Sequence, residues 1–202
     1  MEGHGDNSAI RILLSRIWSE LLGGEYIEIL TPIRTKRNRI VREDELTRAL
    51  GLAVSKLREG ARDKPENSMI LLLLDADSDL PCVLGPDLLR RAHQIRSDMD
   101  IACVIANVDY ETWFAAAAGS LGKFLAFPAG FAITDNPERE RLGKGWVKSR
   151  FRIGQYSPRV DQPRMTQAMD LTLCRQRSLS FDKLCRELEA RFERNAHDSQ
   201  PS

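Results

Sequence analysis

Three aspartates at alternate positions directly follow an apolar run, and their type and spacing point most clearly to chemistry. The apolar run covers residues 70–74, and the acids are Asp75, Asp77 and Asp79. A short apolar run that ends in polar residues is typical of a buried strand in an α/β sheet. Because side chains alternate along an extended strand, we expect the three carboxylates to project to the same side. Crowded carboxylates repel one another, and Mg²⁺ or Mn²⁺ is the kind of hard cation that holds them together.

The spacing of these acids excludes one calcium motif and leaves one phosphatase motif open. An EF-hand loop needs glycine at its sixth position and glutamate at its twelfth, but counting from Asp75 these positions hold Leu80 and Pro86. An apolar strand followed by D-x-D also resembles the haloacid dehalogenase-like phosphatases, whose first aspartate is the phosphoryl nucleophile. That family usually carries threonine or valine where this chain has Asp79, and its motif lies near the N-terminus. The phosphatase therefore stays as the alternative.

Further acids and two groups of bases would surround this site. Asp109 and Glu111 follow the next predicted strand, residues 101–106, so we expect them at the same edge of the sheet, where Glu111 would be a further metal ligand. One basic cluster covers residues 34–42 and another covers residues 139–152; in the second, Lys144, Lys148 and Arg150 are candidates for phosphate binding. A basic rim around an acidic centre suits a metal enzyme that acts on a polyanion.

Helical and strand patterns alternate along the first part of the chain and predict how these residues are positioned. Helical spacing covers residues 8–22, 43–58 and a segment opened by Gly85-Pro86, and strands are expected at 26–30, 70–74 and 101–106. Residues from about 109 enter a further helix. This order predicts an α/β fold with a mainly parallel sheet flanked by helices.

The pattern changes after residue 118. Only short helices, near residues 145–151 and 164–173, precede a last helix that Ser180 would cap. We therefore expect an α/β core over residues 1–118, a basic, mostly helical extension over 119–194 packed on that core, and a disordered tail over 195–202.

Composition sets broad limits on the class of protein. The 202 residues are 42% apolar and 29% charged with a net charge of +1, as in ordinary globular proteins. No apolar run reaches the length of a membrane span, and no signal pattern is present. The four cysteines are scattered without a C-x-x-C pair, which predicts neither a zinc site nor a disulfide framework and favours a cytoplasmic protein.

The N-terminal residues and the D-x-D strand together carry a resemblance to a known fold. The opening Glu2-Gly3-His4-Gly5, the helix that follows and the later strand ending in Asp75 and Asp77 resemble the Toprim domains of topoisomerases, primases and nucleases. The resemblance implies that Glu2 is a general acid/base or metal ligand and that Asp75 and Asp77 are catalytic ligands of Mg²⁺. Asp79 would be an additional ligand.

The two glycines of this opening are also candidates for phosphate binding, for a reason that does not depend on the resemblance. Gly3 and Gly5 would let the backbone approach a phosphate just before the N-terminus of a helix, whose dipole favours anions, and His4 would touch the substrate. In Toprim domains an apolar strand precedes the glutamate. We therefore expect either that this strand is missing or that the true start of the chain lies upstream of Met1.

The resemblance narrows to a bacterial Toprim-like family, a domain of unknown function. Three further segments carry it: Glu111-Thr112-Trp113-Phe114, the stretch Y-x-P-x-x-D-Q-P at residues 156–163, and Ser180-Phe181. Genes of this family often neighbour an ATPase in loci of the phage-defence type, so the resemblance implies an ATPase partner.

The sequence thus predicts a Mg²⁺- or Mn²⁺-dependent phosphoryl-transfer enzyme, foremost a nuclease. Its substrate would be DNA or RNA, and the choice between them stays open, as does that between monomer and homodimer. Two alternatives remain: a phosphatase of the haloacid dehalogenase type acting on a small phosphoester, and a non-catalytic Toprim-like partner of an ATPase.

Overall fold

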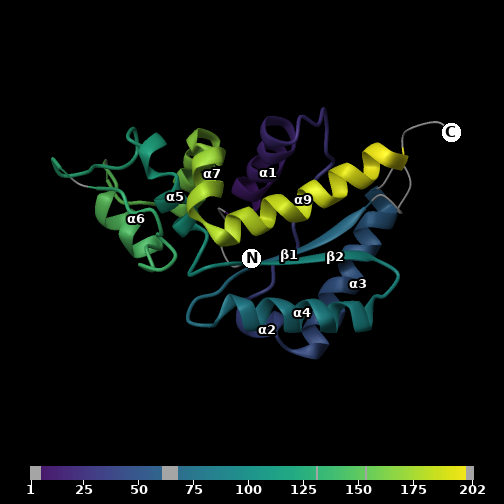
Figure 1. The fold of residues 1–202 in the computed structure, drawn as a ribbon. Helices are drawn as coiled ribbons and strands as arrows, with labels where there is room; N and C mark the ends of the chain where they lie inside the picture. Colours follow the sequence, from purple (N-terminus) through teal and green to yellow (C-terminus); the bar gives the residue numbers. More distant parts are fainter. Residues whose placement is uncertain (1–5, 61–67, 131, 153, 199–202) are drawn as a thin grey trace.

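The computed structural model describes residues 6–60, 68–130, 132–152 and 154–198, which form helices packed around a small sheet (Figure 1). Its elements, in chain order, are α1 (Asp6–Arg16), η1 (Ile17–Leu21), α2 (Arg37–Ile40), α3 (Glu43–Gly60), β1 (Met69–Asp75), α4 (Pro81–Ile95), β2 (Asp100–Ala106), α5 (Glu111–Ala116), η3 (Ala118–Ser120), α6 (Lys144–Arg150), α7 (Pro158–Ala168), α8 (Leu171–Arg177) and α9 (Leu179–Asp198). The opening residues Glu2, Gly3, His4 and Gly5 lie outside the described residues.

The two strands of the described residues, β1 and β2, run parallel and in register from the pair Met69 and Asp100 to the pair Asp75 and Ala106. Each strand alternates between two cores. On one side Ile70 and Leu74 pack with buried residues of α3 and α4, and on the other Leu73 packs with residues of α1, α5 and α9. Figure 1 shows α9 along one face of the sheet and α3 and α4 against the other. The predicted α/β class, a parallel sheet flanked by helices, is confirmed.

The first helix ends where the sequence predicts. Leu13 and Ile17 are fully buried, and α1 continues through the π-helical turn of η1. Gly23 then takes a φ of 71°, which favours glycine, and a Cβ on Gly24 would lie 2.2 Å from Trp18 Nε1. The two glycines therefore reverse the chain at this point and lead it back along α1.

The extension after residue 118 completes the core of the protein. Helix α9 lies on β2 and α7 on α1. Two arginines of α9 form ion pairs with Asp100 at the start of β2: Arg191 Nη2 lies 2.7 Å from Asp100 Oδ1, and Arg194 pairs with the same carboxylate. Helix α9 reaches Asp198, four residues beyond the end that the sequence predicts. None of the described helices combines the length and apolar character needed to cross a bilayer.

Several local predictions are wrong, each for a physical reason. Residues 26–30 form no strand, because no described segment pairs with their backbone. Helix α4 begins at Pro81, which takes the first-turn place expected of Pro86. The expected helix over 164–173 is split between α7 and α8, with Asp170 capping the second.

The predicted cap of the last helix is also wrong. Ser178 Oγ accepts a hydrogen bond from the Phe181 N–H at 3.1 Å, so Ser178 caps α9. The Ser180 hydroxyl instead contacts Glu138 Oε1 at 2.7 Å and accepts the Trp113 indole N–H at 2.9 Å. These bonds tie the start of α9 to α5 and to the loop before α6.

Candidate active site at the carboxyl edge of the sheet

The chain segments that leave β1 and β2 stay together for two further residues. The Ala76 N–H donates to Ala106 O at 2.9 Å, and the Asp77 N–H donates to Val108 O at 2.8 Å. Val108 has a φ of 71°, a strained value for a β-branched residue. These contacts bring the acids after β1 and the acids after β2 to one edge of the sheet, as the sequence predicts for parallel strands.

Asp75 joins the two strand ends through its carboxylate. This half-buried side chain accepts the backbone N–H of Tyr110 at 3.1 Å from Oδ1. Tyr110 lies between Asp109 and Glu111 in the chain, so the bond holds Asp75 against the segment that carries both acids. Tyr110 is itself fixed, because its hydroxyl lies 2.9 Å from Thr166 Oγ1 of α7.

Asp77 and Asp79 follow a different course from Asp75. Strand β1 ends at Asp75, and Asp77 has a φ of 51°, so the expectation of extended backbone through Asp79 is wrong. Both side chains pair with Arg37 of α2: Nε lies 3.9 Å from Asp77 Oδ2, and Nη2 pairs with Asp79 Oδ2. Arg141 also donates to Asp77 O at 2.7 Å. Both basic clusters of the sequence therefore reach this acidic turn.

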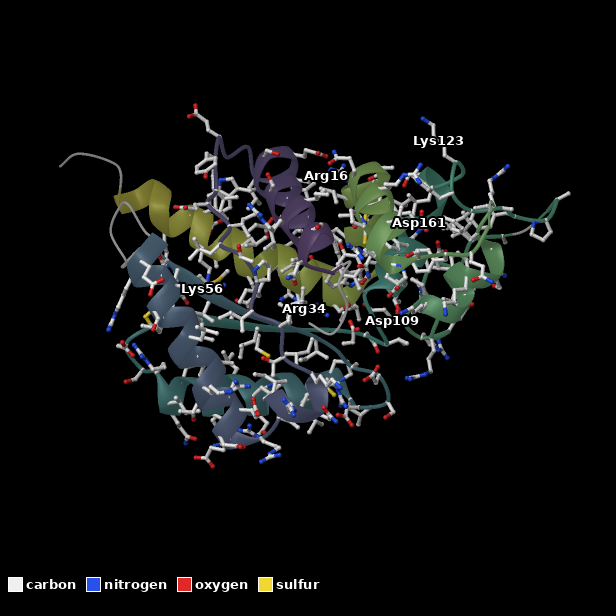
Figure 2. The ribbon with its side chains drawn as sticks, turned by 180° about the vertical axis from the view of Figure 1, so that it is seen from behind. Arg16, Arg34, Lys56, Asp109, Lys123 and Asp161 are labelled. Atoms are coloured by element: carbon white, nitrogen blue, oxygen red, sulfur yellow. The ribbon has the colours of Figure 1, made fainter. Side chains whose placement is uncertain are left out.

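Asp109 is held by a dense set of donors. Its Oδ1 accepts the Thr112 N–H at 3.2 Å, and its Oδ2 accepts the Lys144 N–H at 2.9 Å. A Cβ on Gly143 would lie 2.5 Å from Oδ2, so only glycine leaves room for the carboxylate. Burial raises the pKa of Asp109 above its usual value, although these hydrogen bonds act in the opposite direction. Figure 2 shows Asp109 beside α6.

Glu111 is the most deeply buried acid of the group, with 4% of its surface exposed. Burial, and after it the charge of Asp109, raise the pKa of Glu111 to about 7. The Tyr156 hydroxyl donates to Glu111 Oε1 at 3.1 Å, and burial raises the pKa of that phenol. Trp113 and Phe114, which follow in α5, are fully buried.

The basic residues of α6 differ in their closeness to the acids. The charge of Lys144 lowers the pKa of both Asp109 and Glu111, although burial outweighs it in each case. Lys148 is exposed, and the Arg150 guanidinium stacks on Trp146 at 4.6 Å from the ring centroid. Lys144 is therefore a cation of α6 whose charge acts on these acids.

Sequence reasoning missed four residues that shape this site: Arg37, Gly143, Tyr156 and Thr112. Tyr156 and Thr112 stand within the segments that carry the family resemblance, and Arg37 within a basic cluster, but no spacing in the sequence links them to the acids. No group of three or more histidine, cysteine, aspartate or glutamate side chains in the described part of the chain is placed to hold a metal ion.

One family model matches residues 1–189, a region that includes all these acids and bases. Its description is a domain of unknown function, DUF4276. The chain belongs to this family. The match runs from the N-terminus into α9, so the core and its helical extension are both part of the DUF4276 unit. No curated protein and no solved structure matches the chain significantly.

Proposed function

We propose that this DUF4276 protein is a Mg²⁺-dependent phosphoryl-transfer enzyme, a nuclease on DNA or RNA with a Toprim-like core. One observation carries the proposal: the Asp75 carboxylate binds the backbone between Asp109 and Glu111 at the carboxyl edge of two parallel strands. Ligand sites of parallel α/β sheets lie at this edge. Acids with raised pKa values gather at functional sites more often than elsewhere.

The donor set fits a magnesium ion of the kind that enzymes share with a phosphorylated substrate. Mg²⁺ binds one or two carboxylates and completes its octahedron with water and substrate phosphate. Asp75 and Asp109 are the half-buried carboxylates of the edge and would hold it, with Glu2 as the further ligand that the Toprim resemblance implies. A bound ion would stabilise charge on the phosphoryl oxygens.

The protein side chains supply the remaining parts of such a site. Glu111, with a pKa of about 7, exchanges its proton near neutral pH, as a general acid or base must. Tyr156 orients this carboxyl group through its hydrogen bond. The charge of Lys144 acts on Glu111, Arg37 pairs with Asp77, and both cations would draw the phosphate backbone toward the acids.

Cleavage assays with matched variants test the proposal. Supercoiled plasmid, single-stranded DNA and single-stranded RNA are incubated with the full chain in Mg²⁺, in Mn²⁺ and in EDTA. We expect metal-dependent cleavage that falls by about 100-fold or more in Asp75→Asn and Asp109→Asn, a loss typical when a group that stabilises transition-state charge is removed. Asp98→Asn is the control, because Asp98 pairs with Arg96 on an exposed surface.

Two results would count against this function. If Asp75→Asn and Asp109→Asn cleave as fast as the wild type, neither carboxylate takes part in the reaction. Trapping of a phosphoaspartate at Asp75, without cleavage of any nucleic acid, would instead assign the protein to the phosphatase alternative. Calorimetric titration of Mn²⁺ separates loss of metal binding from loss of catalysis in each variant.

A further inference from the structure

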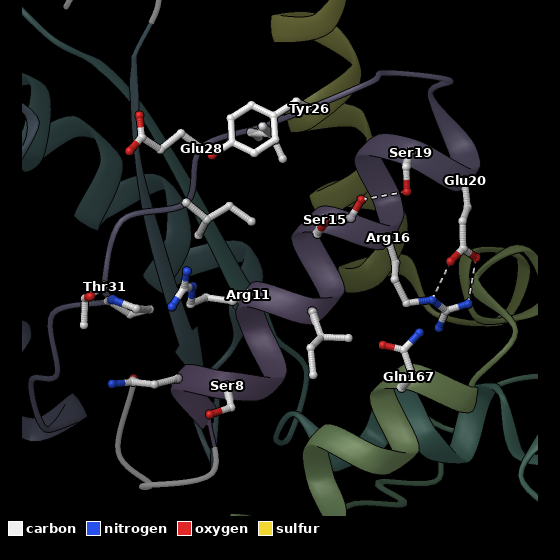
Figure 3. Close-up of a pocket in the computed structure, with 15 residues that line it drawn as sticks. Ser8, Arg11, Ser15, Arg16, Ser19, Glu20, Tyr26, Glu28, Thr31 and Gln167 are labelled. Carbon is white, nitrogen blue, oxygen red and sulfur yellow. Dashed lines mark hydrogen bonds and ion pairs between the residues drawn. The ribbon is translucent and has the colours of Figure 1, made fainter. Parts of the chain in front are cut away.

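A polar groove runs along α1, apart from the acids described above. It has a volume of about 810 Å³, within the range of roughly 300–1,000 Å³ that is common for small-molecule sites. One wall is the face of α1 that carries Asn7, Ser8, Arg11 and Ser15, and the other is the segment of residues 26–32. Figure 3 shows the side chains of both walls around this space.

Two charges of the groove have no partner among the described residues. Arg16 is engaged, because its guanidinium binds Glu20 at 2.7 Å and donates to Thr166 O at 2.7 Å. Arg11 on α1 and Glu28 on the opposite wall are exposed, and within the described part of the chain neither forms a hydrogen bond or ion pair. Among the described residues, the groove therefore presents one unpaired cation and one unpaired anion, which come from different walls.

The groove also presents an exposed aromatic ring and the first turn of a helix. Tyr26 is 79% exposed, the largest exposed fraction among the large apolar side chains of the described residues. Asn7 Oδ1 is buried, and no described residue forms a hydrogen bond with it. Ser8 lies in the first turn of α1, whose dipole favours a negative charge, and Arg11 follows within the next turn. Figure 3 places Tyr26 and Glu28 toward one end of the groove and Ser8 toward the other.

We propose that this groove binds a ribonucleotide. The phosphate contacts Arg11 and Ser8 near the start of α1, and the base stacks on Tyr26. Glu28 accepts hydrogen bonds from the ribose hydroxyls, the role that an acidic residue has in many nucleotide sites. A ligand with an anionic end, a hydroxylated middle and a flat aromatic end matches the cation, the anion and the ring. The same chemistry occurs in a free mononucleotide and in one unit of an RNA strand.

The test is calorimetric titration of the full chain with adenosine 5′-monophosphate in EDTA, so that neither metal nor catalysis enters the result. We expect saturable binding that Arg11→Gln weakens about tenfold or more, as for loss of a hydrogen bond to a charged group. Arg48→Gln is the control, since Arg48 lies exposed on α3. Tyr26→Ala should weaken binding about fivefold or more, and Tyr26→Phe should preserve it.

A sugar comparison tests the part of Glu28. We expect the wild type to prefer adenosine 5′-monophosphate to its 2′-deoxy analogue, and Glu28→Gln to lose that preference. A short oligoribonucleotide titrated in parallel identifies the source: much tighter binding than the mononucleotide assigns the groove to RNA strands, and equal binding assigns it to free nucleotides.

Two outcomes overturn the proposal. If neither probe binds saturably, the protein does not bind ribonucleotides. If a probe binds but Arg11→Gln and Tyr26→Ala leave its affinity unchanged, the groove is not the binding site. Either result is independent of the nuclease proposal, because Asp75→Asn should retain nucleotide binding in this groove even if it abolishes cleavage.

Discussion

Replacement of Glu111 by glutamine should change how the stability of the protein depends on pH. The pKa of Glu111 rises from 4.5 to about 7 on folding, chiefly because the carboxyl is buried. Between pH 4.5 and about pH 7, the folded state therefore keeps a proton on Glu111 that the unfolded state releases. Protonation of this group thus stabilises the folded state at low pH. That stabilisation is complete below pH 4.5 and is lost as the pH rises through about 7.

The size of the effect follows from the shift. A difference of this size between the folded and unfolded pKa is worth roughly 3 kcal/mol, of which about 2–3 kcal/mol is lost between pH 5 and pH 8. Glu111→Gln keeps the shape of the protonated acid and carries no charge. We therefore expect the stability of the wild type, measured relative to this variant, to fall by about 2–3 kcal/mol across that interval.

Urea unfolding at several pH values between 5 and 8, followed by tryptophan fluorescence, measures this difference. Glu193→Gln is the control, because it makes the same substitution at an exposed position of α9. Tyr156→Phe is the complementary variant. The Tyr156 hydroxyl lowers the pKa of Glu111, so its removal should move the loss of stability to higher pH. A constant difference between wild type and Glu111→Gln from pH 5 to pH 8 would refute the reasoning.

Two further predictions concern the packing around the acids. Gly143→Ala places a Cβ 2.5 Å from Asp109 Oδ2, so it should cost about 2–4 kcal/mol in urea unfolding and reduce any metal-dependent cleavage. Gly145→Ala, with open space at its Cβ, is the control, and equal stability of the two variants would contradict the geometry. Ser180→Ala should cost about 1–3 kcal/mol in thermal unfolding, because it leaves the buried Trp113 indole N–H without its acceptor. Ser180→Thr keeps a hydroxyl and should recover part of that loss, whereas an unchanged midpoint in Ser180→Ala would show that the bond contributes nothing.

Much of the fold follows from local patterns. The apolar run before Asp75 and the run over residues 101–106 both form strands. The helical spacing over residues 8–22 and 43–58 predicts α1 with η1, and α3, within a few residues, and the short helix expected near residues 145–151 is α6. Burial of one face sets the spacing of apolar residues in each element, and that spacing can be recognised within the element's own sequence. The segment 26–30 has the pattern of a strand but forms none, because a strand needs a partner that its own sequence does not specify.

The candidate site, like the fold, could be predicted from the sequence only in part. That Asp75 and Asp109 share an edge follows from the order of strands and helices alone, because parallel strands end on the same side. The pairing of Asp77 and Asp79 with Arg37 could not be predicted from that order, because it depends on where β1 ends and on the placement of α2.

By itself the sequence determined which residues carry charge at the ends of two strands, and therefore the chemistry that this edge can support. The tertiary structure alone decided which of those charges are buried. Glu111 gains its raised pKa chiefly from burial by the segments packed around it and then from the charge of Asp109, while the hydrogen bond from Tyr156, 45 positions away, lowers it. Desolvation depends on the atoms that enclose a group, and these come from distant parts of the chain.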